Sequence, residues 1–335
     1  MRRTLLRAAP VAGLTAGLAA CGGARFSLEP AGPAADSIAD LFWAMTILGT
    51  VVFLIFCATL VWALAHRRDP VPRPTPEQDR RRTRMILLFG AALPALVLVP
   101  LLFWTFDSLA AIDPRARPAD LVVDVVGKQW WWEIRYRDSV PGRTFTTANE
   151  LHLPVGKRVE LRLTSTDVIH SFWIPELHGK TDLIPGRENV AWIEASRPGE
   201  YGGQCAEYCG LQHTTMGLLV VAQPEAEYEE WAARQRSAAV TPTDSATDRG
   251  REAFLRACAY CHTVRGTPAG GRLGPDLTHL ASRRTLAAGL LPNTPGHLGG
   301  WIANPQALKP GSRMPRVPMS RDEFRLIHQY LLTLR

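Results

Sequence analysis

The chain has 335 residues, of which 46% are hydrophobic, and its mean hydropathy is −0.04. This length allows two or three domains. The hydropathy excludes a polytopic membrane protein and a disordered chain, and six cysteines are too few for a disulfide-dense scaffold. The net charge of +7 is spread over a leader, a short loop and the last domain, which argues against nucleic-acid binding because no continuous basic stripe forms.

The N-terminal residues 1–20 have the pattern of a bacterial export signal, with three arginines ahead of an apolar stretch that ends in small residues. The run Leu18-Ala19-Ala20-Cys21 also resembles the box cleaved by the lipoprotein signal peptidase. We therefore expect a lipoprotein-type signal peptide that leaves Cys21 acylated; an ordinary leader with a chance cysteine is the alternative.

Two apolar segments without formal charge follow, at residues 41–65 and 85–106. At about 1.5 Å per residue, each can cross a hydrocarbon core of about 30 Å. We expect a transmembrane helix hairpin over residues 36–110, in which Cys57 is a plain buried thiol. The connection, residues 67–84, is rich in arginine, which predicts a cytoplasmic loop and places both termini on the periplasmic side of a bacterial inner membrane.

Residues 118–224 change to short β-type runs separated by turn signals such as Pro185-Gly186 and Pro198-Gly199. Regular short strands of this kind predict a β-sandwich or barrel. The expected strands are residues 121–126, 150–153, 158–163, 189–193 and 217–221.

A helix and linker are expected at residues 225–244, ahead of a last domain over residues 245–335. This domain is predicted to be helical at both ends, with one helix near residues 247–258. A capping box formed by Ser320 and Glu323 is expected to start another helix.

The last domain contains Cys258-Ala-Tyr-Cys261-His262, the C-x-x-C-H motif of covalent haem attachment. Two thiols at this spacing can form thioethers to haem while the imidazole binds the iron. A thioredoxin-like C-x-x-C is disfavoured because no βαβ pattern surrounds the motif. Met314, on a loop bounded by proline and glycine, is the favoured second iron ligand, and Met319 is the alternative.

A second cluster places Cys205, Cys209, His213 and Met216 within 12 residues. Sulfur and imidazole ligands suit copper or zinc, and the thioether favours an electron-transfer copper because zinc sites rarely use methionine. Two cysteines four residues apart can bridge two copper ions. His170, where a predicted strand meets a loop, is the candidate for the second imidazole.

Residues 127–221 resemble the copper-A (CuA) domain of cytochrome c oxidase subunit II. With the C-x-x-C-H domain, the chain resembles bacterial subunits II that carry their own cytochrome c. The resemblance implies a multidomain fold: a two-helix transmembrane hairpin, an all-β cupredoxin-like sandwich or barrel, and an all-α cytochrome c domain.

The implied function is electron transfer within a cytochrome c oxidase, a respiratory translocase. Reduced cytochrome c or another periplasmic donor would reduce haem c, and CuA would pass the electron to the haem of subunit I, which reduces O2 to water. The chain itself would hold no site for oxygen chemistry. Subunit III is the other expected partner.

The resemblance also implies roles for individual residues. Cys205 and Cys209 would bridge the coppers, completed by His170, His213, Met216 and the backbone carbonyl of Glu207. The Glu207 side chain would help to bind magnesium at the interface with subunit I.

Three adjacent tryptophans, at positions 130–132, resemble the family's aromatic patch. Trp130 is the candidate for the residue through which electrons enter, and at least one of the three is expected to pack on the barrel. Gly274-Pro275 resembles the loop whose carbonyl orients the haem histidine. His152 and His178 are expected to be surface or packing residues.

One departure from the family concerns the start of the second span, residues 82–87, where many members carry a glutamate and this chain has no acid. Proton uptake on that side would then depend on subunit I. The opposite net charges of residues 107–224 (−3) and 245–335 (+8) suggest that the two domains steer one another into contact.

Three other functions compete with this hypothesis. A copper-binding assembly factor or chaperone has no use for a C-x-x-C-H domain. A protein similar to nitrous-oxide reductase would add a large histidine-rich domain, whereas this chain has nine histidines. A quinol oxidase subunit would lack the copper ligands.

Overall fold

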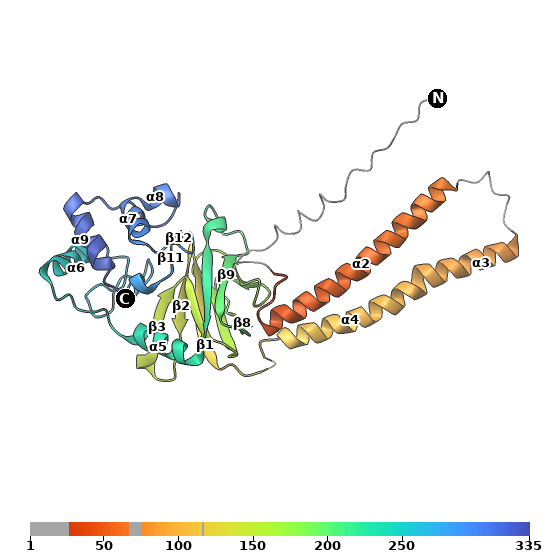
Figure 1. The fold of residues 1–335 in the computed structure, drawn as a ribbon, viewed down its shortest axis with the longest axis horizontal. Helices are drawn as coiled ribbons and strands as arrows, with labels where there is room; N and C mark the ends of the chain where they lie inside the picture. The colour runs from red at the N-terminus through yellow and green to blue at the C-terminus, as the bar shows by residue number, and fades with distance from the viewer. Residues whose placement is uncertain (1–26, 67–74, 116) are drawn as a thin grey trace, which may run out of the picture. The chain divides into compact units, whose positions relative to one another are not determined.

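The computed structural model describes residues 27–66, 75–115 and 117–335. The predicted signal peptide and Cys21 lie outside the described residues. The chain divides into two compact units, Pro33–Pro118 and a larger unit that consists mainly of Ala119–Arg335. Figure 1 shows the elements of each unit in chain order.

Long apolar helices make up the first unit. Helix α2 covers Pro33–Ala65, and the second helix runs through α3 (Pro76–Leu87), a π-helical turn at Leu88–Ala92 and α4 (Leu93–Ile112). Both are long and apolar enough to cross a membrane, and most of their large apolar side chains are exposed. The predicted hairpin is therefore confirmed as two candidate membrane helices.

The second helix begins well before the predicted span. Thr75 Oγ1 accepts a hydrogen bond from the Gln78 backbone N–H at 3.3 Å, and the Gln78 side chain accepts one from the Thr75 N–H at 3.0 Å. This capping box starts α3 at Pro76, so the arginines at 80–84 lie on a helix and not in a loop. The π-helical turn directly precedes the segment containing Pro94, whose missing N–H is accommodated by such local adjustments.

A sandwich of two five-stranded sheets begins the second unit. The first sheet has the order β3-β2-β1-β5-β8 and the second the order β4-β10-β9-β6-β7. Strands β1 and β5 pair in parallel, as do β4 and β10, and the other pairs in these sheets are antiparallel. The strands are β1 Leu121–Lys128, β2 Trp131–Tyr136, β3 Phe145–Ala148, β4 Glu150–Pro154, β5 Val159–Ser165, β6 His170–Trp173, β7 Thr181–Leu183, β8 Asn189–Ile193, β9 Gly199–Cys205 and β10 Gly217–Gln223.

The core of the sandwich follows from alternation along the strands. In β5, Val159, Leu161 and Leu163 are fully buried while the residues between them are partly exposed. The residues that follow β10 form helix α5 (Glu225–Arg236), whose Trp231 stacks on His152 with ring centroids 4.0 Å apart. The predicted cupredoxin-like sandwich is confirmed, and His152 is a packing residue.

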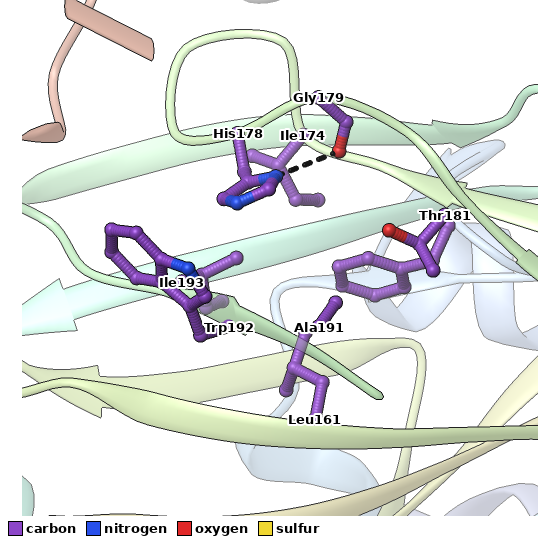
Figure 2. A pocket seen from close by; sticks show the side chains of 9 residues that line it. Leu161, Ile174, His178, Gly179, Thr181, Ala191, Trp192 and Ile193 are labelled. Atoms are coloured by element: carbon purple, nitrogen blue, oxygen red, sulfur yellow. Dashed lines mark hydrogen bonds between the residues drawn. The ribbon is translucent and has the colours of Figure 1, made fainter. Parts of the chain in front are cut away.

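A small hollow within the sandwich surrounds His178 (Figure 2). The imidazole Nδ1 donates to the Gly179 carbonyl at 3.2 Å and the ring packs edge-on against Trp192. Burial lowers the pKa of His178, so the ring is neutral at neutral pH. The lining side chains leave no space for a water molecule, which makes His178 a packing residue as well.

Helices are the main regular elements of the haem domain, residues 245–335. It contains α6 (Ser245–Ala257), α7 (Pro295–Ala303), α8 (Pro305–Leu308) and α9 (Arg321–Leu331), with a short pair of strands, β11 (Thr285–Leu286) and β12 (Leu291–Pro292). The predicted capping box at Ser320 and Glu323 starts α9. Helices α6 and α9 approach closely at Gly250, where a Cβ atom would lie 2.3 Å from the Leu326 carbonyl oxygen.

Candidate metal and haem sites

The predicted copper ligands converge at one end of the sandwich. His170 is the first residue of β6, Cys205 is the last residue of β9, and the other ligand candidates lie in the loop that leads to β10. The two Sγ atoms are 3.7 Å apart, and Cys205 Sγ lies 3.9 Å from His170 Nδ1. Among the described residues, His170, Cys205 and Cys209 form a cluster that could hold a metal ion.

The remaining ligand candidates complete this cluster. Cys209 Sγ is 3.7 Å from His213 Nδ1 and 3.9 Å from Met216 Sδ, while Cys205 Sγ is 3.2 Å from the Glu207 carbonyl oxygen. The set contains two thiols, two imidazoles, a thioether and a carbonyl. These donors fit a pair of copper ions better than one tetrahedral zinc.

The two thiols contact each other through a hydrogen bond. Their mutual hydrogen bond lowers the pKa of Cys205 to about 3 and raises the pKa of Cys209. The lowered pKa of Cys205 favours its thiolate, the form that binds metal, and two bound cations would stabilise a second thiolate at Cys209.

A carboxylate outside the ligand set orients His170. Its Nε2 lies 2.8 Å from Asp167 Oδ1, which leaves Nδ1 directed at Cys205. Asp167 also accepts the Gln129 backbone N–H at 2.7 Å. A carboxylate behind a ligating imidazole fixes its tautomer and orientation. Its position three residues before His170 is a signal that could have been found in the sequence.

A cavity of about 700 Å³ contains the haem-attachment motif. Cys258, Cys261 and His262 line it, and both Met314 and Met319 lie on its wall. His262 Nδ1 donates to the Pro275 carbonyl at 2.8 Å, which leaves Nε2 free to bind iron. Burial lowers the pKa of His262, which keeps the imidazole neutral as an iron ligand must be.

The cavity is also lined by a partly buried cation, Arg283, that sequence reasoning missed. Arg283 donates from Nη2 to the Asp276 carbonyl, and its buried Nε has no hydrogen-bond partner among the described residues. Burial lowers the pKa of Arg283, and Glu150 and Asp276 oppose this shift. An acidic group in the cavity would be a favourable partner for the unpaired Nε. The propionates of haem are such groups, and the lining therefore fits haem.

The tryptophans at 130–132 have different environments. Trp132 is fully buried and packs edge-on against His170 and Phe172, so it is the member that packs in the sandwich. Trp130 and Trp131 line the haem cavity. The Trp130 indole Nε1 donates to the Cys209 carbonyl at 3.0 Å, and Gln129 Nε2 donates to the same oxygen at 2.8 Å.

Comparisons with known proteins match both of these domains. The family described as "Cytochrome C oxidase subunit II, periplasmic domain" matches residues 141–223, and the family "Cytochrome c" matches residues 247–335. The fold and sites thus define a membrane-anchored protein with a CuA copper domain and a haem-binding cytochrome c domain.

Relatives match over nearly the full chain. "Cytochrome c oxidase subunit 2" of Alkalihalophilus pseudofirmus is 33% identical over 99% of this chain and 98% of its own length. The protein of that name from Bacillus subtilis is 28% identical over 95% of this chain and 94% of its own. A crystal structure of the periplasmic domain of subunit II of cytochrome oxidase from Bradyrhizobium japonicum aligns over 36% of this chain and 96% of that chain, with 31% identity and a TM-score of 0.34.

The chain belongs to the cytochrome c oxidase subunit II family and carries a fused cytochrome c domain. This membership implies an oxidase complex in which subunit I is the partner. Two candidate membrane helices and a periplasmic-type domain fit a protein of the inner membrane.

Proposed function

We propose that this chain accepts electrons at haem c and passes them through the copper pair to the haem of subunit I, where O2 is reduced to water. The donor is a reduced cytochrome c or another periplasmic redox protein. Each transfer moves one electron, so the donor is oxidised by one unit and the acceptor is reduced by one unit.

One observation carries the proposal: the haem cavity and the copper cluster share Trp130. Its indole lines the cavity and donates a hydrogen bond to the carbonyl of Cys209, one of the two bridging thiolate candidates. A single side chain therefore connects the haem cavity to the backbone of a copper ligand.

The haem would be held by four residues of the last domain. Cys258 and Cys261 would hold the haem covalently, with His262 and Met314 on its iron. Met319 also packs against the helical core, whereas Met314 does not, which supports Met314 as the ligand. Bound haem iron and bound copper supply reversible one-electron chemistry.

The copper ligands are suited to electron transfer and not to copper delivery. Cys205, Cys209 and Met216 are buried. A copper chaperone needs ligands that a partner can reach, so this burial favours a resident copper pair.

Glu207 is the proposed link to subunit I. Its side chain is about half exposed, with a relative accessibility of 43%, and lies 3.7 Å from Lys180. The carboxylate is thus exposed enough to contribute to a magnesium site shared with subunit I, while the backbone carbonyl of the same residue faces the copper cluster.

The two apolar helices would anchor the chain in the inner membrane. Both termini and both soluble domains lie on the periplasmic side, and an acylated Cys21 adds a lipid anchor. Subunit III and an external donor are the remaining partners.

Spectra and metal analysis of the purified oxidase complex test this function. We expect a covalently bound haem c, two copper ions assigned to this chain, and O2 consumption that requires both. Zinc in place of copper, or no covalent haem, would overturn the proposal.

A further inference from the structure

Two buried charged side chains cross the boundary between the copper domain (residues 118–224) and the haem domain. Lys309 of the haem domain and Glu150 of the copper domain each have a relative accessibility of 3%. Burying an ammonium or a carboxylate is costly unless its hydrogen bonds are satisfied. Their partners therefore show what these charges do.

Lys309 follows α8 and donates to carbonyl oxygens of both domains. Its Nζ lies 3.1 Å from the Trp130 oxygen, 2.9 Å from the Thr215 oxygen and 3.0 Å from the Ala287 oxygen. An ammonium has three donors, so all of them are used. Burial lowers the pKa of Lys309 to about 8, which leaves the side chain charged at neutral pH.

The two carbonyls on the copper domain lie next to the proposed route. One belongs to Trp130, and the other belongs to Thr215, the residue before Met216. Lys309 thus ties the haem domain to the tryptophan between the two sites and to the copper-ligand loop.

Glu150, the first residue of β4, makes the reciprocal contact. Its Oε1 accepts from the backbone N–H groups of Arg284 and Thr285 at 2.7 and 2.8 Å, and from Thr285 Oγ1 at 3.2 Å. A backbone hydrogen bond from Gly217 N–H to the Ala288 carbonyl, at 2.9 Å, lies on the same boundary. Each domain therefore satisfies a buried charge of the other.

We propose that Lys309 is a positioning residue that holds the haem domain against the copper domain in the arrangement used for electron transfer. The inference rests on the proposed route from haem c to copper. In this arrangement the two domains are held together by short, buried contacts and not by long-range attraction between opposite net charges. Salt screens buried contacts much less than exposed ones such as the Arg284–Glu200 ion pair.

The test is the rate of internal electron transfer in the purified oxidase complex. The haem is photoreduced by a ruthenium sensitiser, and the visible haem band and near-infrared copper band are followed in time. Lys309→Met removes the charge and keeps a side chain of similar length. We expect transfer to slow at least about tenfold, because a charged hydrogen bond contributes more than the free energy that corresponds to a factor of ten.

Salt dependence supplies a readout that a packing defect would not change. The wild-type rate should vary little with added salt, whereas the Lys309→Met rate should fall with salt because exposed pairs then hold the domains together. Lys157→Met is the matched control, since Lys157 is partly exposed and pairs with Glu225 away from this boundary. Its rate should equal that of the wild type.

The outcomes separate this inference from the proposed function. If haem does not reduce copper in the wild type, the proposed route fails. If the wild type transfers electrons and Lys309→Met, with both cofactors bound, does so at the same rate, Lys309 is not the positioning residue. If Lys309→Met loses a cofactor, Glu150→Gln provides the test instead. Slower transfer in Glu150→Gln supports docking through buried charges, and an unchanged rate in Glu150→Gln overturns it.

Discussion

The copper cluster and the haem cavity are built in different ways although they belong to one compact unit. The copper ligand candidates lie on strand ends and one short loop, and a complete sandwich core supports them. The haem ligand candidates line a cavity of about 700 Å³, to whose wall both the haem domain and the copper domain contribute. Each domain has a hydrophobic core of its own, but core residues of the haem domain such as Phe254, Leu298 and Ile327 also line the cavity, so bound haem would extend that core.

The largest expected effect tests this dependence of the haem domain on haem. In the full chain, replacing Cys258 and Cys261 by alanine removes both thioether positions. We expect complete loss of covalent haem and a haem domain that unfolds at much lower temperature, because side chains around a large cavity lose packing contacts. Visible spectra and thermal scans give the result. If the haem domain melted at the wild-type temperature, its packing would not depend on haem.

The corresponding change in the copper domain is Cys209→Ser, which removes one of the two candidates for a bridging thiolate. The sandwich core should keep the copper domain folded, while the near-infrared copper band disappears and O2 consumption falls to background. Covalent haem should be retained, as measured by its visible band. If the dinuclear band survived, Cys209 would not be a bridging ligand.

Preorganisation of the copper cluster is tested by Asp167→Asn. The weaker acceptor behind His170 should lower copper affinity by about 10–100-fold. Copper titration of the chain followed in the near infrared measures this affinity. Asp138→Asn, on the turn after β2, is the control and should bind copper as the wild type does. Equal affinity for both variants would show that Asp167 does not orient the ligand.

The connection between the two regions is tested by Trp130→Phe, which keeps an aromatic ring but removes the indole N–H donated to Cys209. We expect haem-to-copper transfer to slow by roughly tenfold or less, because one hydrogen bond is lost. Trp131→Phe, whose tryptophan lines the cavity beside Lys128, is the matched control. If Trp131→Phe slowed the transfer more than Trp130→Phe does, the electron route would run through Trp131 and not through Trp130.

The smallest expected effect concerns α9. Ser320→Ala removes the capping box and should destabilise the haem domain by about 1 kcal/mol, with the copper spectrum unchanged. Thermal unfolding followed at the haem band measures the change. A simultaneous shift of the copper spectrum would show that the two regions are more tightly coupled than their separate cores indicate.

Much of the architecture could be predicted from the sequence because its signals are local. Alternation and turn residues indicated the strands, and Cys205 to Met216 fall within one short segment. The start of the second membrane helix is not predicted, because the arginine-rich composition of α3 indicates a loop although Thr75 and Gln78 form a capping box there.

The contacts that join the domains could not be predicted, because their partners are far apart in the sequence. Lys309 contacts the carbonyl of Trp130, and Glu150 contacts Arg284 and Thr285. A single lysine in an arginine-rich domain carries no sequence signal for such a role. Only the folded chain brings these groups together.

If electrons enter at haem c and only then reach copper, the two centres must be reduced in that order, and rapid mixing can resolve this order. The oxidised complex is mixed rapidly with a reduced periplasmic cytochrome c, and both absorption bands are followed. We expect the haem band to change first and copper reduction to follow as the haem is reoxidised. Copper reduced before the haem, or at an unchanged rate when Cys258 and Cys261 are replaced, would contradict it.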